Sequence, residues 1–178
     1  MGKIKNQSII DLANEIEDFS KSIAKEMAIK SREDLYKAAN NAITKFYNHY
    51  TPDYYKRHII PYYQHNINKG IKKYYHSPHG NIYSGGIELS PESMDDLYKI
   101  RKDYIFNLIL AGFHGNIPML PDMTHYTNQT SRSVPPIMEP SPLNLILDER
   151  DRLIKNVSKD ANDIAQRIKK EKGYKYIS

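Results

Sequence analysis

The apolar positions of the chain recur with a helical period in two adjacent N-terminal segments. Ile9 and Ile16 belong to the apolar face of the first segment, and the second segment carries apolar side chains at every third or fourth position. Ser31, followed three residues later by an aspartate, resembles a capping start between the two segments, and the next proline ends the second. The pattern therefore predicts two N-terminal helices, over residues 8–29 and 32–51.

Two further helices are predicted from a serine cap that is followed by proline at the first helical position. This arrangement occurs at Ser90 and again at Ser141. The first of these helices covers residues 91–111 and ends before Gly112, and the second covers residues 142–172. Four helices are therefore expected: two N-terminal, one central and one long C-terminal.

The helical period is lost between the second and third predicted helices. Residues 53–89 contain seven tyrosines and several isoleucines, divided by runs of serine, proline, glycine and asparagine. Short runs rich in tyrosine and isoleucine between turn residues are typical of strands and hairpins. We expect a small antiparallel sheet with strands around 56–64, 70–76 and 82–89. No βαβ repeat is present, so the fold class is predicted as α+β.

The stretch that follows the central helix lacks periodicity and is rich in proline. Residues 113–142 contain six of the ten prolines of the chain and few charges. Their large apolar side chains are unusual for a linker and predict an extended arm over 113–141 that a partner orders. Five of these side chains are predicted interface residues: Met119, Leu120, Met123, Ile137 and Met138. With 178 residues, the chain is expected to form a single domain over 1–178.

Composition removes most catalytic and metal chemistries. The chain has no cysteine, which excludes disulfides, thiolate metal sites and a cysteine nucleophile. His76 and His79 could serve as metal ligands, but no acid lies between Asp53 and Glu88, and the sequence around them is also typical of a turn. No nucleophile elbow occurs, and the paired carboxylates suit helix starts. We therefore expect no enzymatic activity, no cofactor and no metal. The apolar stretches are too short for a membrane span, so no membrane partner is expected.

Tyrosine is the unusual component of the composition, with 15 residues against four phenylalanines and no tryptophan. Tyrosines alternate with basic residues in the stretch that lacks acids, and the net charge of the chain is +5. Lysines that follow phosphates and tyrosines that stack on unpaired bases would bind single-stranded nucleic acid. Tyrosine is equally favoured where protein subunits meet. The residues concerned are Tyr54, Tyr55, Tyr62, Tyr63, Tyr74 and Tyr75 as interface candidates, and Lys56, Arg57, Lys69, Lys72 and Lys73 as candidates for DNA contact.

Three blocks of the sequence resemble a known family. The run Ala42-Ile43-x-x-Phe46-Tyr47-x-x-Tyr50-x-Pro52-x-x-Tyr55-x-Arg57 is similar to a segment near the N-terminus of minor virion proteins in phages of low-GC Gram-positive bacteria. Those proteins look like the head–tail connector, or tail-completion, family. The runs Ala111-Gly-Phe-His114-Gly115 and Pro140-Ser-Pro-Leu143 also resemble their counterparts there. The segment after Gly115 has no clear match.

The resemblance implies a non-enzymatic α+β subunit that assembles into a ring at the head–tail (neck/tail) interface. Its partners would be copies of itself and portal, connector or tail proteins, with transient contact to packaged DNA. The protein would be made in the host cytoplasm and reside in the virion. The alternative is a sequence-nonspecific single-strand nucleic-acid-binding protein that uses the stretch 54–75.

Overall fold

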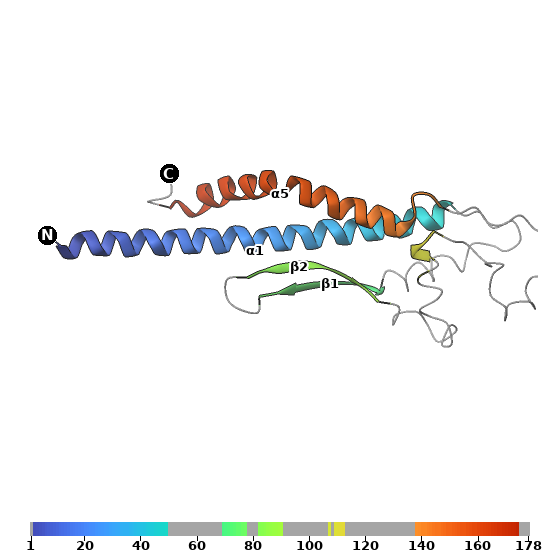
Figure 1. The fold of residues 1–178 in the computed structure, drawn as a ribbon, viewed down its shortest axis with the longest axis horizontal. Helices are drawn as coiled ribbons and strands as arrows, with labels where there is room; N and C mark the ends of the chain where they lie inside the picture. The colour runs from blue at the N-terminus through green and yellow to red at the C-terminus, as the bar shows by residue number, and fades with distance from the viewer. Residues whose placement is uncertain are drawn as a thin grey trace, which may run out of the picture. The chain divides into compact units, whose positions relative to one another are not determined.

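The N-terminal part of the protein is one long helix. A computed structural model describes residues 2–49, 69–77, 82–90, 107, 109–112 and 138–174. Helix α1 runs without interruption from Gly2 to His49, 48 residues (Figure 1). The predicted division into helices 8–29 and 32–51 is therefore wrong. The predicted total of four is wrong as well, since the described residues contain two helices, α1 and α5, although the α+β composition is retained.

Local chemistry explains why α1 continues through Ser31. Asp34, which the predicted cap requires at a helix start, instead pairs with Lys30 one turn earlier. Opposite charges four residues apart stabilise a continuous helix by about 0.2–0.5 kcal/mol. No glycine or proline occurs between Met27 and Tyr50, so nothing in the backbone stops the helix there.

The C-terminal helix has the bounds that the sequence predicts. Helix α5 spans Pro142–Lys172. Its cap is Ser141, whose hydroxyl accepts a hydrogen bond from the backbone N–H of Asn144 at 3.2 Å. At the other end Gly173 has a φ of +61°, and its N–H donates to the carbonyl of Lys169 at 3.1 Å. The predicted Ser-Pro start is confirmed.

The two described strands form a hairpin. Strands β1 (Ile71–His76) and β2 (Ser84–Leu89) pair as a two-stranded antiparallel sheet (Figure 1). Beyond the strand ends, the N–H of Ser90 donates to the carbonyl of Gly70 at 2.8 Å. The predicted strands 70–76 and 82–89 are confirmed with small shifts at their starts. The predicted strand 56–64 lies outside the described residues.

Only the C-terminal end of the predicted central helix is described. Ile109 and Leu110 are buried there, and the N–H of Ala111 donates to the carbonyl of Asn107 at 2.9 Å. Gly112 follows with a φ of +85°, a conformation that favours glycine. Helix residues 91–106 and arm residues 113–137 lie outside the described part of the chain, and those predictions stay predictions.

The chain divides into two compact units. Unit 1 comprises residues 1–34, 73–87 and 150–178, and unit 2 comprises residues 35–72 and 88–149. Among the described residues, unit 1 buries Ala28, Ile164 and Ile168, whereas unit 2 buries Ala39, Ala42, Ile43, Phe46, Ile71, Ile109, Leu110, Met138 and Ile146. The better-packed core is therefore that of unit 2. Because α1 and α5 contribute residues to both units, the predicted single domain over 1–178 stays a prediction.

Candidate interaction surfaces

In unit 1, the first part of α1 and the second part of α5 run antiparallel along each other (Figure 1). Asp18 pairs with Lys172 at 2.8 Å, and Lys30 lies 3.6 Å from Asp160. Asp18 and Lys30 are twelve residues apart on α1, and their partners Lys172 and Asp160 are twelve residues apart on α5 in the opposite direction. This register places residues 2–15 of α1 beyond Tyr174, the last described residue of the chain.

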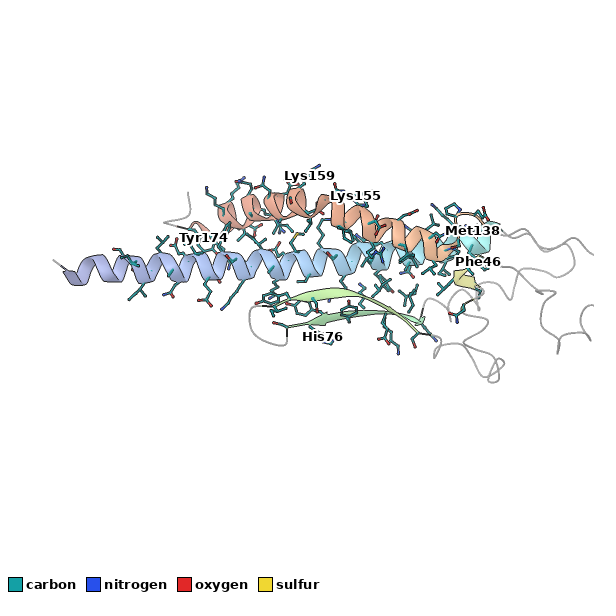
Figure 2. The ribbon with its side chains drawn as sticks, in the orientation of Figure 1. Phe46, His76, Met138, Lys155, Lys159 and Tyr174 are labelled. Atoms are coloured by element: carbon teal, nitrogen blue, oxygen red, sulfur yellow. The ribbon has the colours of Figure 1, made fainter. Side chains whose placement is uncertain are left out.

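The end of this helix pair is a small polar and aromatic cluster around Asp18. Tyr174 lies beside α1 (Figure 2). Its hydroxyl donates to the Asp18 carboxylate, and its ring meets Phe19 edge-on at 5.4 Å between centroids. Lys172 also donates to the hydroxyl of Ser22 at 2.9 Å. These contacts fix the C-terminal turn against the side of α1.

Electrostatics in this cluster favours the charged carboxylate. The hydrogen bond from Lys172, followed by that from Tyr174, lowers the pKa of the Asp18 carboxyl below its ordinary value. The hydrogen bond to Asp18 raises the pKa of the Lys172 ammonium. Burial raises the pKa of the Tyr174 hydroxyl, and its hydrogen bond to Asp18 acts in the same direction. Asp18, Lys172 and Tyr174 therefore form a cluster, here called the Asp18 clasp, in which the carboxylate and the ammonium stabilise each other's charged form.

Large apolar side chains remain exposed on both helices of unit 1. Ile9 is 64% exposed and Ile16 is 50% exposed on α1, and Ile154 is 63% exposed on α5. Ile10 and Val157 are exposed to a similar degree. Ile9 and Ile16, seven residues apart, share one face of α1. The sequence pattern assigned both to an inner helix face, whereas in the structure both are exposed on the side of α1 opposite Asp18, which faces α5.

The face of the hairpin that carries Lys73, Tyr75 and Gly85 packs against α1. Lys73 pairs with Glu33 of α1 at 2.6 Å, which lowers the pKa of the Glu33 carboxyl. A Cβ added at Gly85 would lie 2.1 Å from the carbonyl oxygen of Ala28, so the two backbones are nearly in contact. Tyr75 is half-buried on this face, and its ring lies 6.3 Å from that of Tyr83.

The opposite face of the hairpin carries side chains that are exposed among the described residues. Strand alternation places Tyr74 and His76 on it, both exposed, with ring centroids 5.5 Å apart (Figure 2). Tyr74 lies across Gly86 of β2: a Cβ added there would be 2.7 Å from the Tyr74 hydroxyl oxygen. An aromatic ring that covers a cross-strand glycine is a known way to stabilise a sheet. This face therefore presents the aromatic pair Tyr74 and His76 beside Gly86.

The hairpin separates the predicted contact residues into two groups. Lys69, Lys72 and Tyr74 are exposed, whereas Lys73 is ion-paired and Tyr75 faces α1. The sequence pattern grouped these residues together, because it could not indicate which face of the hairpin α1 covers. The other members of the predicted set lie outside the described residues: Tyr54, Tyr55, Tyr62, Tyr63, Lys56, Arg57, Met119, Leu120, Met123 and Ile137.

Met138, the described member of the predicted arm contacts, lies in the interior of unit 2. It is 6% exposed, and its N–H donates to the carbonyl of Gly112 at 2.9 Å. A Cβ added at Gly112 would lie 2.5 Å from the Met138 carbonyl oxygen. The close approach of these two backbones explains why glycine stands at position 112.

A search of the described residues finds no cluster of metal ligands. No three histidine or acidic side chains converge there as metal ligands. The described helices include none that is both long enough and apolar enough to cross a bilayer. No protein-family model, curated protein or solved structure matches the chain.

Proposed function

We propose that this chain is a non-enzymatic structural protein of a phage virion. It works at the head–tail (neck/tail) interface, as a ring subunit that contacts portal or tail proteins. The observation that supports the proposal is the small number of buried apolar side chains in unit 1 compared with the number that are exposed. Its described residues bury three apolar side chains, while Ile9, Ile10, Ile16, Ile154 and Val157 are about half exposed or more.

The energetics of unit 1 favour association. The ion pairs that link its two helices, such as Glu26–Arg167 and Asp18–Lys172, join exposed side chains and add little stability because water screens them. Full burial of an isoleucine or valine side chain contributes about 1.5–3 kcal/mol. An interface that covered the exposed isoleucines would therefore supply stability that unit 1 lacks by itself. Contiguous exposed apolar surface marks protein contact sites, and Ile9 and Ile16 share one face of α1.

The described residues support assembly better than nucleic-acid binding. A single-strand binder needs several stacking rings beside free cations. In the hairpin, Lys73 is neutralised by Glu33 and Tyr75 is turned toward α1, which leaves Tyr74 as the exposed tyrosine of β1. Single-strand binding is kept as an outcome of the test below.

Light scattering of the purified protein, alone and mixed with its cognate portal protein, tests the proposal. We expect a ring, or a monomer that joins a larger complex with portal. A protein that stays monomeric and binds neither portal nor tail protein would contradict it. Parallel titration with single-stranded DNA at rising salt identifies the alternative, which predicts affinity that falls steeply with salt and with Tyr74→Ala.

A further inference from the structure

We propose that the face of α5 turned away from α1 binds the phosphate backbone of double-stranded DNA. Five exposed residues share this face and are here called the α5 lysine row: Lys155, Lys159, Asn162, Gln166 and Lys170. All of them belong to unit 1. This inference goes beyond the proposed function and does not depend on it, because a structural subunit that joins its neighbours through one surface can contact DNA with another.

The α5 lysine row follows the period of the helix. Lys155 and Lys159 lie on the side of α5 that faces away from α1 (Figure 2). Asn162, Gln166 and Lys170 follow Lys159 at three, seven and eleven residues, which is the spacing of positions on one helical face. Lys155 and Lys170 are fifteen residues apart, so the row is about 22 Å long. This length is comparable with the axial rise of about six base pairs of DNA.

The positive charges of the row are not neutralised within the protein. Lys155, Lys159 and Lys170 form no ion pair with any side chain in the part of the chain that the structure describes. Arg167 differs, because it lies toward α1 and pairs there with Glu26. The three lysines of the row are therefore available to an anion from outside.

The acids of the same part of α5 leave the row largely unopposed. Residues 150–172 contain eight basic and four acidic side chains. Three of the acids pair with other cations: Asp151 with Arg150, Asp160 with Lys30 and Glu171 with Arg167. The fourth, Asp163, lies one turn after Lys159 at the edge of the row, and no described side chain forms an ion pair with it. Asp163 is therefore the acid that a polyanion bound along the row would meet.

The composition of this face favours duplex DNA over other anionic partners. Residues 150–172 contain no aromatic side chain on which an unpaired base could stack. Lysine is depleted in protein–protein interfaces, whereas protein–DNA interfaces are strongly positive, and lysine and amide side chains both bind phosphate oxygens. A helix that lies on a bilayer needs a free apolar face, whereas Ile164 and Ile168 of α5 are buried.

A salt-dependent titration tests the contact with DNA. The intact protein is added to a labelled DNA duplex, and fluorescence anisotropy gives the binding constant at several salt concentrations. Because three lysines would neutralise phosphates, the logarithm of the binding constant should fall with the logarithm of the salt concentration with a slope of about −3.

Charge-neutral variants assign the binding to the row. Lys155→Gln combined with Lys159→Gln should lower the affinity at low salt about tenfold or more and reduce the salt slope by about two. Lys37→Gln combined with Lys45→Gln is the matched control, because both lysines are exposed on α1 and neither forms an ion pair with a described residue. Its affinity should stay within about twofold of the natural protein.

Removal of the nearby acid gives a test in the opposite direction. Asp163→Asn should increase the affinity about twofold or more, because the carboxylate repels phosphate at the edge of the row. Circular dichroism checks that each variant keeps its helices, which is expected because every substituted side chain is exposed.

The outcomes separate this inference from the proposed function. Equal affinity and equal salt slope in the natural protein and in the Lys155→Gln, Lys159→Gln variant would overturn the inference. Tighter binding to single-stranded than to duplex DNA, binding to phosphatidylserine vesicles in place of DNA, or loss of portal binding alone in that variant would overturn it as well.

Duplex binding through the row by a protein that binds neither portal nor tail protein supports the inference and contradicts the proposed function. Portal binding without affinity for duplex DNA does the reverse.

Discussion

Asp18, near the start of α1, accepts a hydrogen bond from Lys172 at 2.8 Å, although 154 residues separate the two in sequence. This pair sets the register between the two helices of unit 1. It also marks the point beyond which α1 has no described α5 residue beside it. Ile9 lies nine residues before Asp18, on the opposite side of α1, and is 64% exposed.

The Asp18 clasp should loosen in acid and in strong base. The pKa of Asp18 is lowered from its ordinary value of 3.8, so its contribution is present above that pH and is lost as the pH falls through the folded-state pKa. The pKa values of Lys172 and Tyr174 are raised above 10.5 and 10.0, so their contributions are present below those values and are lost as the pH rises through the folded-state pKa values.

Proton NMR of the Phe19 ring, which contacts Tyr174, reports this change locally. We expect its resonances to move below about pH 4 in the natural protein. Asp18→Asn should remove most of that acid transition, and Asp151→Asn, whose carboxylate contacts the adjacent Arg150, should retain it. An acid transition that is identical in all three proteins would contradict the clasp.

Gly85→Ala should separate the hairpin from α1. The added methyl group would lie 2.1 Å from the carbonyl oxygen of Ala28, and a backbone atom cannot move aside cheaply. We expect a loss of about 1–3 kcal/mol in the free energy of unfolding, measured by urea denaturation. Gly86→Ala is the matched control, because its methyl group meets the movable end of the Tyr74 side chain. An equal loss in both variants would argue against the close packing on Ala28.

Ser141→Ala and Ser31→Ala should have opposite effects. Removal of the Ser141 hydroxyl deletes the hydrogen bond from Asn144 and should cost about 0.5–2 kcal/mol in the free energy of unfolding. Ser31 lies inside α1, where alanine is the better helix former, so its replacement should leave stability unchanged or slightly higher. If residues 32–51 formed a separate helix capped by Ser31, both substitutions would destabilise in thermal melts followed by circular dichroism.

Gly112→Ala should destabilise more than Gly173→Ala. Both glycines have a positive φ, and alanine in that conformation costs about 1–2 kcal/mol. At Gly112 the methyl group would also meet the carbonyl oxygen of Met138 at 2.5 Å, whereas nothing lies within 4 Å of it at Gly173. Urea midpoints of the two variants measure the difference. Equal midpoints would show that the Gly112–Met138 approach adds no constraint.

Local signals in the sequence were sufficient where one short segment decides the structure. The Ser-Pro start of α5 works through a single hydroxyl and the next three residues, so the sequence predicts it directly. The strands β1 and β2 are likewise indicated by their tyrosines and isoleucines between turn residues. Alternation along β1 places Tyr74 and Tyr75 on opposite faces, although both belonged to one predicted set of interface residues.

The tertiary structure alone decided which surfaces are open. Helix α1 is covered by the hairpin at Ala28 and by α5 near Glu26, so its apolar positions fall on more than one side. A helix with two covered sides has no single apolar stripe, and the pattern of its apolar positions therefore resembles that of two shorter helices. Whether Lys73 is free or paired depends on Glu33, 40 residues away in sequence. The sequence by itself determined the start of α5 and the two strands, whereas it divided α1 wrongly and could not show that Ile9 and Ile154 are exposed, because burial is a property of packing between distant segments.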